Sequence, residues 1–352
     1  MIMKKLAVLL AIFCMSAVLS QAATTIVLTH SSTPTTYSDL DSVWAVVAPG
    51  DTVDIQDFDG PLTWTKTFSV LPSWTTLECT KAGAQATLLV PGGNGGNNSI
   101  GALDHTTLLN LIIDGQGTSA NAFNGGSSST VTNCTIKNFT WNNIFIANGS
   151  MTGGVQDPGV TFTDCYMYST ACCLAFTGGY VSAPATIPNK TILNHCTMVN
   201  PGGFIINLDA NLDGKDLKSV YSIRNSILSS RDSGVCVVYA GAGLTDAATQ
   251  VDEDYNLFDC TWNIFYGQGG GTSSGMTVVG AHSFTFNKND IPATHPDYFR
   301  DYAAKDFRLG GVGAFGNWVP GGNICIDKAS DGGNIGADIT TVPVELSNFS
   351  AE

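Results

Sequence analysis

One short sequence motif recurs along this chain at a nearly constant interval, and it restricts the possible folds more than any other feature. Cys134, Cys165 and Cys196 lie 31 residues apart, and each has the same pattern of apolar and polar neighbours. Related phrases follow at intervals of about thirty residues, around Ser226 and Asn256. A fixed period of this length indicates a repeat protein, in which each unit packs mainly against its neighbours.

Each repeat has the pattern of β-strands and turns. Its apolar runs span four to six residues and are bounded by Gly, Asn, Ser and Pro. A second apolar run follows each phrase, at positions 144–146, 174–176, 204–206, 235–238 and 264–266. Short strands without helices between them predict the coils of a parallel β-helix, stacked about 4.8 Å apart. Equivalent residues then form ladders along the solenoid. The cysteine positions are expected to form one inward ladder, and positions 136, 167, 198, 228 and 258 an apolar ladder beside it.

The ends of such a solenoid need separate elements, because they would otherwise expose strand edges and core. Ser38 is expected to cap a short helix whose buried face carries Leu40, Val43, Trp44 and Val47. Toward the other end, residues 305–309 and 324–327 are expected to form the last irregular coils.

The first 22 residues have the organisation of a secretory signal. Lys4 and Lys5 precede a largely apolar stretch, and small residues stand at positions 20 and 22. Beyond this segment, no apolar run reaches the ~20 residues that span a bilayer. We therefore expect an extracellular or cell-surface protein. The formal net charge is −14, which argues against nucleic acid and anionic membranes as partners, because both bind Lys/Arg-rich surfaces.

Several phrases are similar to those of a known superfamily. They are Ala48–Val53 at the start, Asp254–Phe258, Asp306–Leu309, Ile324–Asp327 and Gly333–Asp338. In these phrases the chain resembles exported bacterial right-handed parallel β-helix proteins of the pectate-lyase-like superfamily. The resemblance implies an all-β fold, with one right-handed parallel β-helix domain over residues 23–338 and a linker-like tail over residues 339–352. It implies no particular activity, because the superfamily includes polysaccharide lyases, hydrolases, esterases and adhesins.

One loop has the spacing of a calcium site. Asp209, Asn211 and Asp213 follow the D-x-N-x-D-G pattern, in which alternate oxygens converge on a hard cation. The bidentate Glu of an EF-hand is missing, so Asp216 or a neighbouring coil would have to complete the coordination. Calcium is thus a possible cofactor. The alternative is a polar turn, in which Asp, Asn and Gly are favoured anyway.

A second candidate site lies beside the cysteine positions. Asp164 and His195 each precede a ladder cysteine, so strand alternation would place them outside the solenoid on adjacent coils. A carboxylate beside an imidazole favours a general base. Tyr166, Trp141 and Trp262 are candidate stacking platforms for sugar rings. The alternative is a solvated polar ladder with a surface ion pair of little consequence, together with tryptophans that cover the core.

Two functions remain open. A lyase acting on an acidic polysaccharide needs cations in its groove, and the few Lys and Arg residues form no column. A glycoside hydrolase needs two carboxylates about 5–10 Å apart, and nothing in the sequence pairs them. We therefore predict a secreted or cell-surface protein with a glycan-binding, adhesive or structural role and a polysaccharide or surface glycan as partner. The alternative is a polysaccharide-degrading enzyme, either a glycoside hydrolase or a lyase, acting in a groove along the solenoid.

Overall fold

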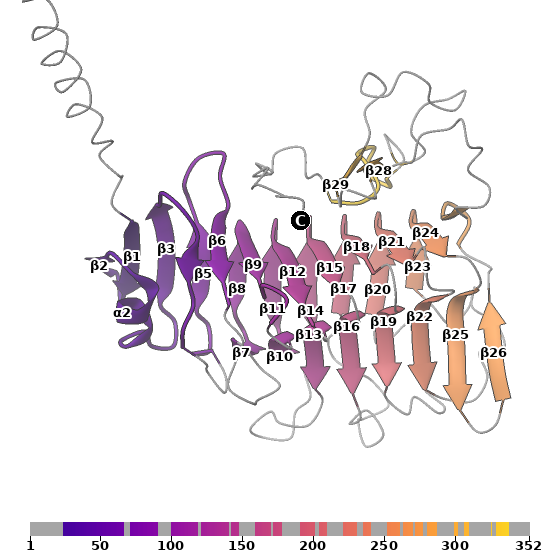
Figure 1. Cartoon of the computed structure of the whole chain (residues 1–352), viewed down its shortest axis with the longest axis horizontal. Helices are drawn as coiled ribbons and strands as arrows, with labels where there is room; N and C mark the ends of the chain where they lie inside the picture. Colours follow the sequence, from indigo (N-terminus) through magenta and orange to yellow (C-terminus); the bar gives the residue numbers. More distant parts are fainter. Residues whose placement is uncertain are drawn as a thin grey trace, which may run out of the picture.

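The fold is a stack of β-coils along one long axis (Figure 1). It is seen in a computed structural model, which describes residues 24–66, 71–90, 100–118, 121–140, 142–147, 159–169, 172–177, 191–200, 204–209, 221–230, 235–240, 252–260, 263–269, 272–276, 280–286, 299–301, 306–309, 325 and 329–337. The predicted signal over residues 1–22 and the predicted tail over residues 339–352 lie outside these ranges. Each full coil contributes one strand to each of three sheets.

The three sheets are named here in the order in which the chain visits them. In hydrogen-bonded order, sheet 1 contains β2 (Thr33–Tyr37), β1 (Thr25–His30), β3 (Thr52–Asp57), β5 (Thr76–Cys79), β8 (Thr107–Leu109), β11 (Ser129–Thr132), β14 (Val160–Thr163), β17 (Thr191–Asn194), β20 (Tyr221–Arg224) and β23 (Asp252–Asp254). Sheet 2 contains β27 (Phe284–Phe286), β24 (Leu257–Cys260), β21 (Ile227–Ser230), β18 (Thr197–Val199), β15 (Tyr166–Ser169), β12 (Thr135–Phe139), β9 (Leu111–Asp114), β6 (Ala86–Leu89) and β4 (Leu62–Thr63). Sheet 3 contains β26 (Thr272–Met276), β25 (Asn263–Gly269), β22 (Val235–Ala240), β19 (Phe204–Asp209), β16 (Cys172–Thr177), β13 (Asn142–Ala147), β10 (Asn121–Ser127) and β7 (Gly101–Asp104).

Pairing between successive coils is parallel, which confirms the predicted parallel β-solenoid. The second apolar run of each repeat forms β13, β16, β19, β22 and β25 of sheet 3, as the sequence predicts. The apolar ladder is also confirmed, because Ile136, Met167, Met198, Leu228 and Phe258 pair in register and are fully buried.

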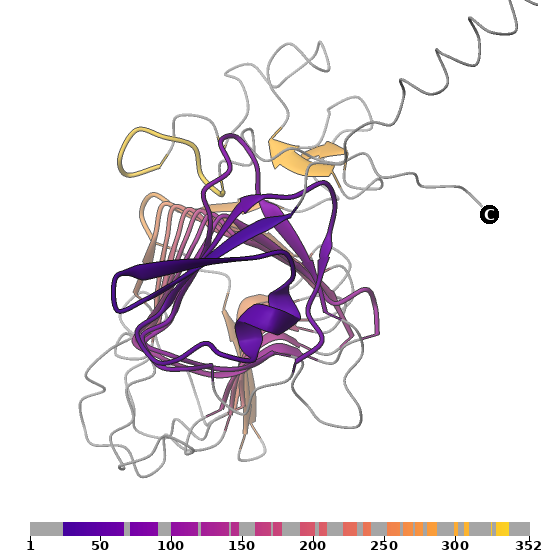
Figure 2. The same cartoon turned by 90° about the vertical axis from the view of Figure 1, so that its left-hand side faces the viewer.

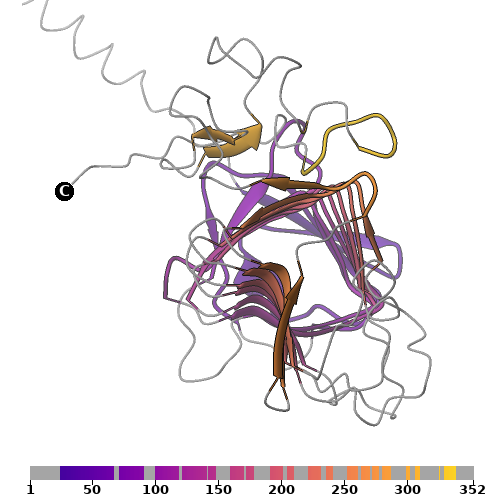
Figure 3. The same ribbon diagram turned by 90° about the vertical axis from the view of Figure 1, so that its right-hand side faces the viewer.

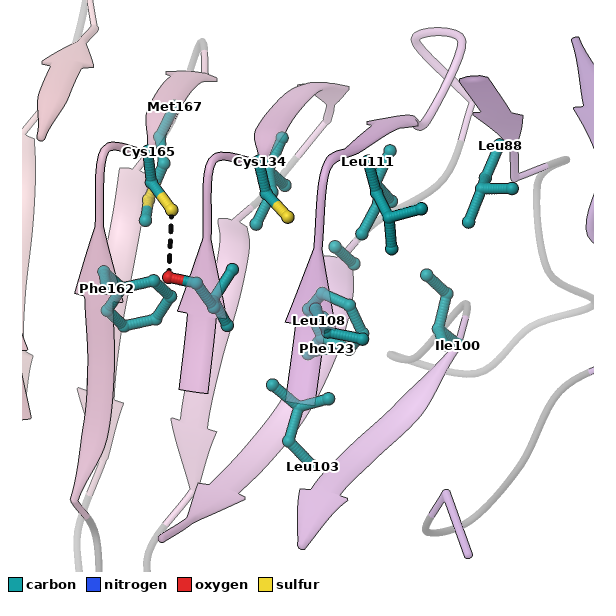
Figure 4. Close-up of a cluster of buried hydrophobic side chains, with 14 of the residues drawn as sticks. Leu88, Ile100, Leu103, Leu108, Leu111, Phe123, Cys134, Phe162, Cys165 and Met167 are labelled. Carbon is teal, nitrogen blue, oxygen red and sulfur yellow. Dashed lines mark hydrogen bonds between the residues drawn. The ribbon is translucent and has the colours of Figure 1, made fainter. Parts of the chain in front are cut away.

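The cysteine positions form the predicted inward ladder, with Cys134, Cys165 and Cys196 buried as free thiols. Figure 4 shows Cys134 and Cys165 on adjacent coils. Burial raises the pKa of Cys134 to about 12. Burial, and then the neighbouring Cys165, raise the pKa of Cys196. Cys165 donates a hydrogen bond from its thiol to the carbonyl of Val131 over 3.2 Å. These thiols therefore act as small hydrophobic side chains of the core.

The N-terminal end carries the short helix α2 (Leu40–Trp44), whose Leu40, Val43 and Trp44 are buried. Seen from that end, the helix lies within the outline of the coils (Figure 2). The prediction of Ser38 as the cap was wrong. Asp39 is the N-cap, because its carboxylate accepts a hydrogen bond from the backbone N–H of Ser42 over 2.8 Å.

The edge strands of sheet 1 carry features that discourage further pairing. At one edge, β2 contains Pro34, which has no N–H to donate to another strand. At the other edge, β23 consists of Asp252, Glu253 and Asp254. Three consecutive acidic residues oppose the approach of a further strand of this acidic chain.

The C-terminal part of the chain returns over sheet 2 and does not extend the stack. We call it the C-terminal cover; it comprises β28 (Phe299–Asp301), β29 (Asp306–Leu309), Cys325 and Ala329–Ala337. Strands β28 and β29 pair antiparallel with each other and lie outside the coils, above sheet 2 in Figures 1 and 3. The prediction that residues 305–309 and 324–327 form the last coils was therefore wrong for Asp306–Leu309 and Cys325, since their apolar side chains pack on sheet 2 from outside.

Apolar contacts and hydrogen bonds hold the cover in place. A second core cluster joins outward residues of sheet 2 to the cover; its buried members are Tyr168, Val199, Ile227, Leu257, Phe299, Phe307, Cys325, Ala329 and Ile335. Asn225 accepts hydrogen bonds from the backbone N–H groups of Ser330 and Gly336. Thr197 accepts another from the N–H of Ala337 over 3.0 Å. Sheet 2 is thus buried on both faces over β15, β18, β21 and β24, the strands that contact the cover.

Candidate functional site

The outer face of sheet 1 carries one uninterrupted row of hydroxyl groups. Six threonines occupy consecutive strands in register, and we call them the threonine ladder: Thr29, Thr52, Thr76, Thr107, Thr130 and Thr161. They alternate with buried apolar residues along their strands, so they point away from the core. Neighbouring strands lie about 4.8 Å apart. The ladder therefore presents a straight row of hydroxyl and methyl groups at that repeat.

A second outward row lies beside the threonine ladder. On β8, β11, β14 and β17 it consists of Leu109, Thr132, Thr163 and Asn194. The outward positions of these four strands carry no charge. Charged outward residues lie on the flanking strands: Asp54 on β3, Glu78 on β5, Arg224 on β20, and Asp252 and Asp254 on β23. The middle of the face is thus a neutral, hydroxyl-rich surface.

One corner of sheet 1 carries an exposed aromatic stack. Trp74 and His105 lie two residues before Thr76 of β5 and Thr107 of β8, and their φ angles of 67° and 51° lie in the left-handed region. Their rings stack with centroids 4.1 Å apart and an interplanar angle of 27°. Nδ1 of His105 lies 2.8 Å from Oδ1 of Asp104, and Ser73 donates a hydrogen bond to the other oxygen of that carboxylate. These four side chains form one connected group beside the threonine ladder.

The opposite corner of sheet 1 contains the column that includes the predicted catalytic pair. Asp164 and His195 do lie on adjacent coils, because the N–H of Asp164 donates to the carbonyl of Asn194 over 3.1 Å. Both have left-handed φ angles, of 52° and 50°. The bend between sheets 1 and 2 therefore sets their position, whereas the prediction had assumed alternation along a strand.

His195 contacts the C-terminal cover through both nitrogens of its ring. Nε2 lies 2.8 Å from Oδ2 of Asp331, and Nδ1 lies 3.0 Å from the carbonyl oxygen of Asn334. The side chain of His195 is only 14% exposed. The backbone N–H of Gly333, and then the imidazole of His195, lower the pKa of Asp331. In this arrangement His195 attaches the C-terminal cover to the corner between sheets 1 and 2.

The other predicted site residues lie apart from sheet 1 or outside the described ranges. Tyr166 is half-buried under the cover and stacks on Phe307, with ring centroids 5.8 Å apart. Trp141 and Trp262 lie outside the described residues.

The predicted calcium loop lies almost entirely outside the described residues. Asp209 ends β19, while its side chain and the residues Asn211, Asp213 and Asp216 fall outside what the structure describes. Within the described ranges, no three His, Cys, Asp or Glu side chains gather closely enough to hold a metal ion. The calcium site stays a prediction.

The threonine ladder and the Trp74 stack were missed by sequence reasoning. A signal for the ladder was present, since Thr130-Val-Thr132 and Thr161-Phe-Thr163 recur at the same 31-residue period as the cysteines. The stack has no such signal, because Trp74 and His105 belong to corners that precede the recognisable repeats.

Comparison with known proteins adds no family assignment. No protein-family model matches this sequence, and no curated protein matches it. Among the residues that the structure describes, no helix has the length and apolar character needed to cross a bilayer. The functional interpretation therefore rests on the surfaces described above.

Proposed function

We propose that this chain is an exported right-handed parallel β-helix protein, capped by α2, that binds a neutral polysaccharide through the outer face of sheet 1. The observation that carries the proposal is the threonine ladder, with its six in-register side chains. The secretory signal predicted over residues 1–22 and the resemblance to exported β-helix proteins support a location at or outside the cell surface.

A row of threonines suits a long hydroxylated ligand. Each hydroxyl both donates and accepts hydrogen bonds, and each methyl group offers an apolar contact. A polysaccharide repeats its own hydroxyls along its length, so several threonines can contact one chain at once. Once one sugar of a polymer is bound, its neighbours are held close to the next threonines, so several weak contacts combine into a higher overall affinity. The ladder therefore favours an extended polymer over a small ligand.

The charges favour a neutral glycan. The face itself carries the acidic residues Asp54, Glu78 and Asp254 on β3, β5 and β23, and burial, followed by the nearby charge of Asp54, raises the pKa of Glu78. The whole chain has a formal net charge of −14. A polyanion would be repelled by this field, whereas a neutral polymer would not.

The alternative, a glycan-cleaving enzyme, depends on Asp164 and His195. A general base needs a ring nitrogen that faces the substrate. Both nitrogens of His195 contact the C-terminal cover instead. We therefore propose binding rather than cleavage for this surface.

Co-sedimentation with insoluble cellulose, chitin, mannan and xylan tests the proposal. We expect at least one of these polymers to retain the wild-type protein without release of new reducing ends. The triple variant Thr107→Lys, Thr130→Lys and Thr161→Lys should lose retention, because three lysines interrupt the row. Thr285→Lys is the matched control, since Thr285 is an exposed strand threonine of sheet 2. Equal retention of both variants would rule out the sheet 1 face, and reducing-end release would favour the enzyme.

A further inference from the structure

Trp74 is the most exposed large hydrophobic side chain in the part of the chain that the structure describes, at 63%. It is nevertheless held at its backbone, because its N–H donates to the carbonyl of Asp104 over 3.2 Å. The carbonyl of Ser73, the residue before Trp74, accepts a hydrogen bond from the N–H of Gly50 over 3.0 Å. Backbone hydrogen bonds on both sides of this position thus fix the point from which the indole projects at the corner of sheet 1.

The stack leaves Trp74 one face for a ligand. His105 covers one side of the indole, with the ring centroids 4.1 Å apart, and is itself 31% exposed. Since 63% of Trp74 is still accessible, the accessible area lies on the opposite face and the ring edges. From this geometry we infer that Trp74, His105, Asp104 and Ser73 form a subsite for one neutral pyranose ring of the glycan bound along the threonine ladder. This inference rests on the proposed function and names the contact that anchors the polymer.

The polar groups of the subsite match the edge of a sugar ring. The carboxylate of Asp104 accepts hydrogen bonds from His105 and Ser73. A carboxylate can accept about four hydrogen bonds, so Asp104 retains capacity for sugar hydroxyls. The apolar C–H face of a pyranose would lie against the electron-rich face of the indole. An acidic sugar would be repelled by Asp104, so the subsite selects neutral sugars.

Position connects this subsite to the threonine ladder. Trp74 is two residues before Thr76, and His105 is two residues before Thr107. Both threonines belong to the ladder and pair with each other in register. A polymer stacked on Trp74 would therefore continue over adjacent hydroxyls of the ladder.

The same combination of groups recurs at the other corner of sheet 1. Tyr255 stacks on His282 with centroids 4.4 Å apart and an angle of 13°. Nδ1 of His282 lies 3.1 Å from Oδ2 of Asp254. Two aromatic–imidazole–carboxylate groups thus flank the same face at opposite corners, one beside β5 and β8 and the other beside the edge strand β23.

Calorimetric titration with soluble neutral hexasaccharides of glucose, mannose, xylose and N-acetylglucosamine tests the subsite. We expect wild type to bind at least one of them and Trp74→Ala to lose about tenfold in affinity, with most of it restored in Trp74→Phe. Asp104→Asn should also weaken binding, and its melting temperature shows whether its fold is intact. Val46→Ala is the matched control, because Val46 is another exposed apolar residue, at 54%, and should bind like wild type.

The outcomes separate this inference from the proposed function. Unchanged affinity in Trp74→Ala would overturn the subsite, while loss of polymer retention in the threonine triple variant would still support the binding face. Binding of uronic-acid oligosaccharides in preference to all neutral ones would overturn the neutral-sugar assignment. Failure of wild type to bind any hexasaccharide, with insoluble polymer still retained, would overturn the subsite alone.

Discussion

The outer faces of sheets 1 and 2 are built by the same coils and have opposite chemistry. Outward positions of sheet 1 carry the threonine ladder, whereas those of sheet 2 carry Tyr166, Tyr168, Val199, Ile227 and Leu257. The apolar face is covered by the C-terminal cover, and the hydroxyl-rich face keeps partly exposed side chains. A large apolar patch left open to water marks an interaction site or an aggregation liability. In this protein the apolar patch is buried by the C-terminal cover. The polar face of sheet 1 is therefore the one available to partners.

The largest effect is expected from a charge placed under the cover. Ile335→Asp would bury a carboxylate at a position that is 0% exposed, so it should cost about 3 kcal/mol or release the cover. Thr130→Asp on sheet 1 should change stability by about 1 kcal/mol, the span of strand propensities. Urea unfolding and limited proteolysis measure both. Equal effects of the two variants would mean that the two faces do not differ as described.

A smaller effect is expected at Gly336, where the backbone of the cover lies close to sheet 2. Gly336 has a φ of 91°, and an added Cβ would lie 2.7 Å from Cδ1 of Ile227 and from Oγ1 of Thr197. Gly336→Ala should therefore destabilise the cover by about 2 kcal/mol or more. Gly332→Ala is the control, because its φ of 84° is similar and nothing lies within 4 Å of the added Cβ. A loss no larger than that of Gly332→Ala would contradict the close contact.

Acid should weaken the attachment of the cover. The folded-state pKa of Asp331 lies below its ordinary value of 3.8, so its contribution is complete above that pH and is lost as pH falls through the lowered value. Asp331→Asn should therefore increase proteolysis of the cover at pH 7, and the difference from wild type should vanish in stronger acid. Asp59→Asn, on an exposed turn, is the control. A difference that persists unchanged in acid strong enough to protonate Asp331 would count against the His195–Asp331 contact.

The smallest effect is expected from removing single hydroxyls of the ladder. Thr130→Ala should change stability by at most about 1 kcal/mol, the span of strand propensities. It should weaken polymer retention slightly, because five ladder threonines remain. Val199→Ala under the cover should do the reverse, with a loss of stability of about 1–2 kcal/mol and unchanged retention. A strong effect of Val199→Ala on retention would assign binding to the cover instead.

The sequence predicted the interior of this fold better than its exterior. The 31-residue period of Cys134, Cys165 and Cys196 correctly predicted parallel coils and two inward ladders, because each coil pairs with its neighbour in register. The contact of His195 with Asp331 joins residues 136 positions apart, so no periodic signal indicates it. The helix cap was misplaced by one residue, because Ser38 and Asp39 are both good caps. Trp74 was missed because the sequence repeats in the strands, whereas the corner residues between them differ from coil to coil.

Hydroxyl-radical footprinting with and without the polysaccharides of the binding panel tests the central claim most directly. It measures the oxidation of side chains on both outer faces in one experiment. Ile192 continues the outward row from Thr161 onto β17. We predict that a bound polymer lowers the oxidation of Leu109 and Ile192 on sheet 1 and of Trp74 at its corner, and leaves Tyr166 and Phe307 unchanged. Unchanged oxidation on sheet 1 with every polymer, or protection confined to Tyr166 and Phe307, would contradict the assignment of glycan binding to the threonine face.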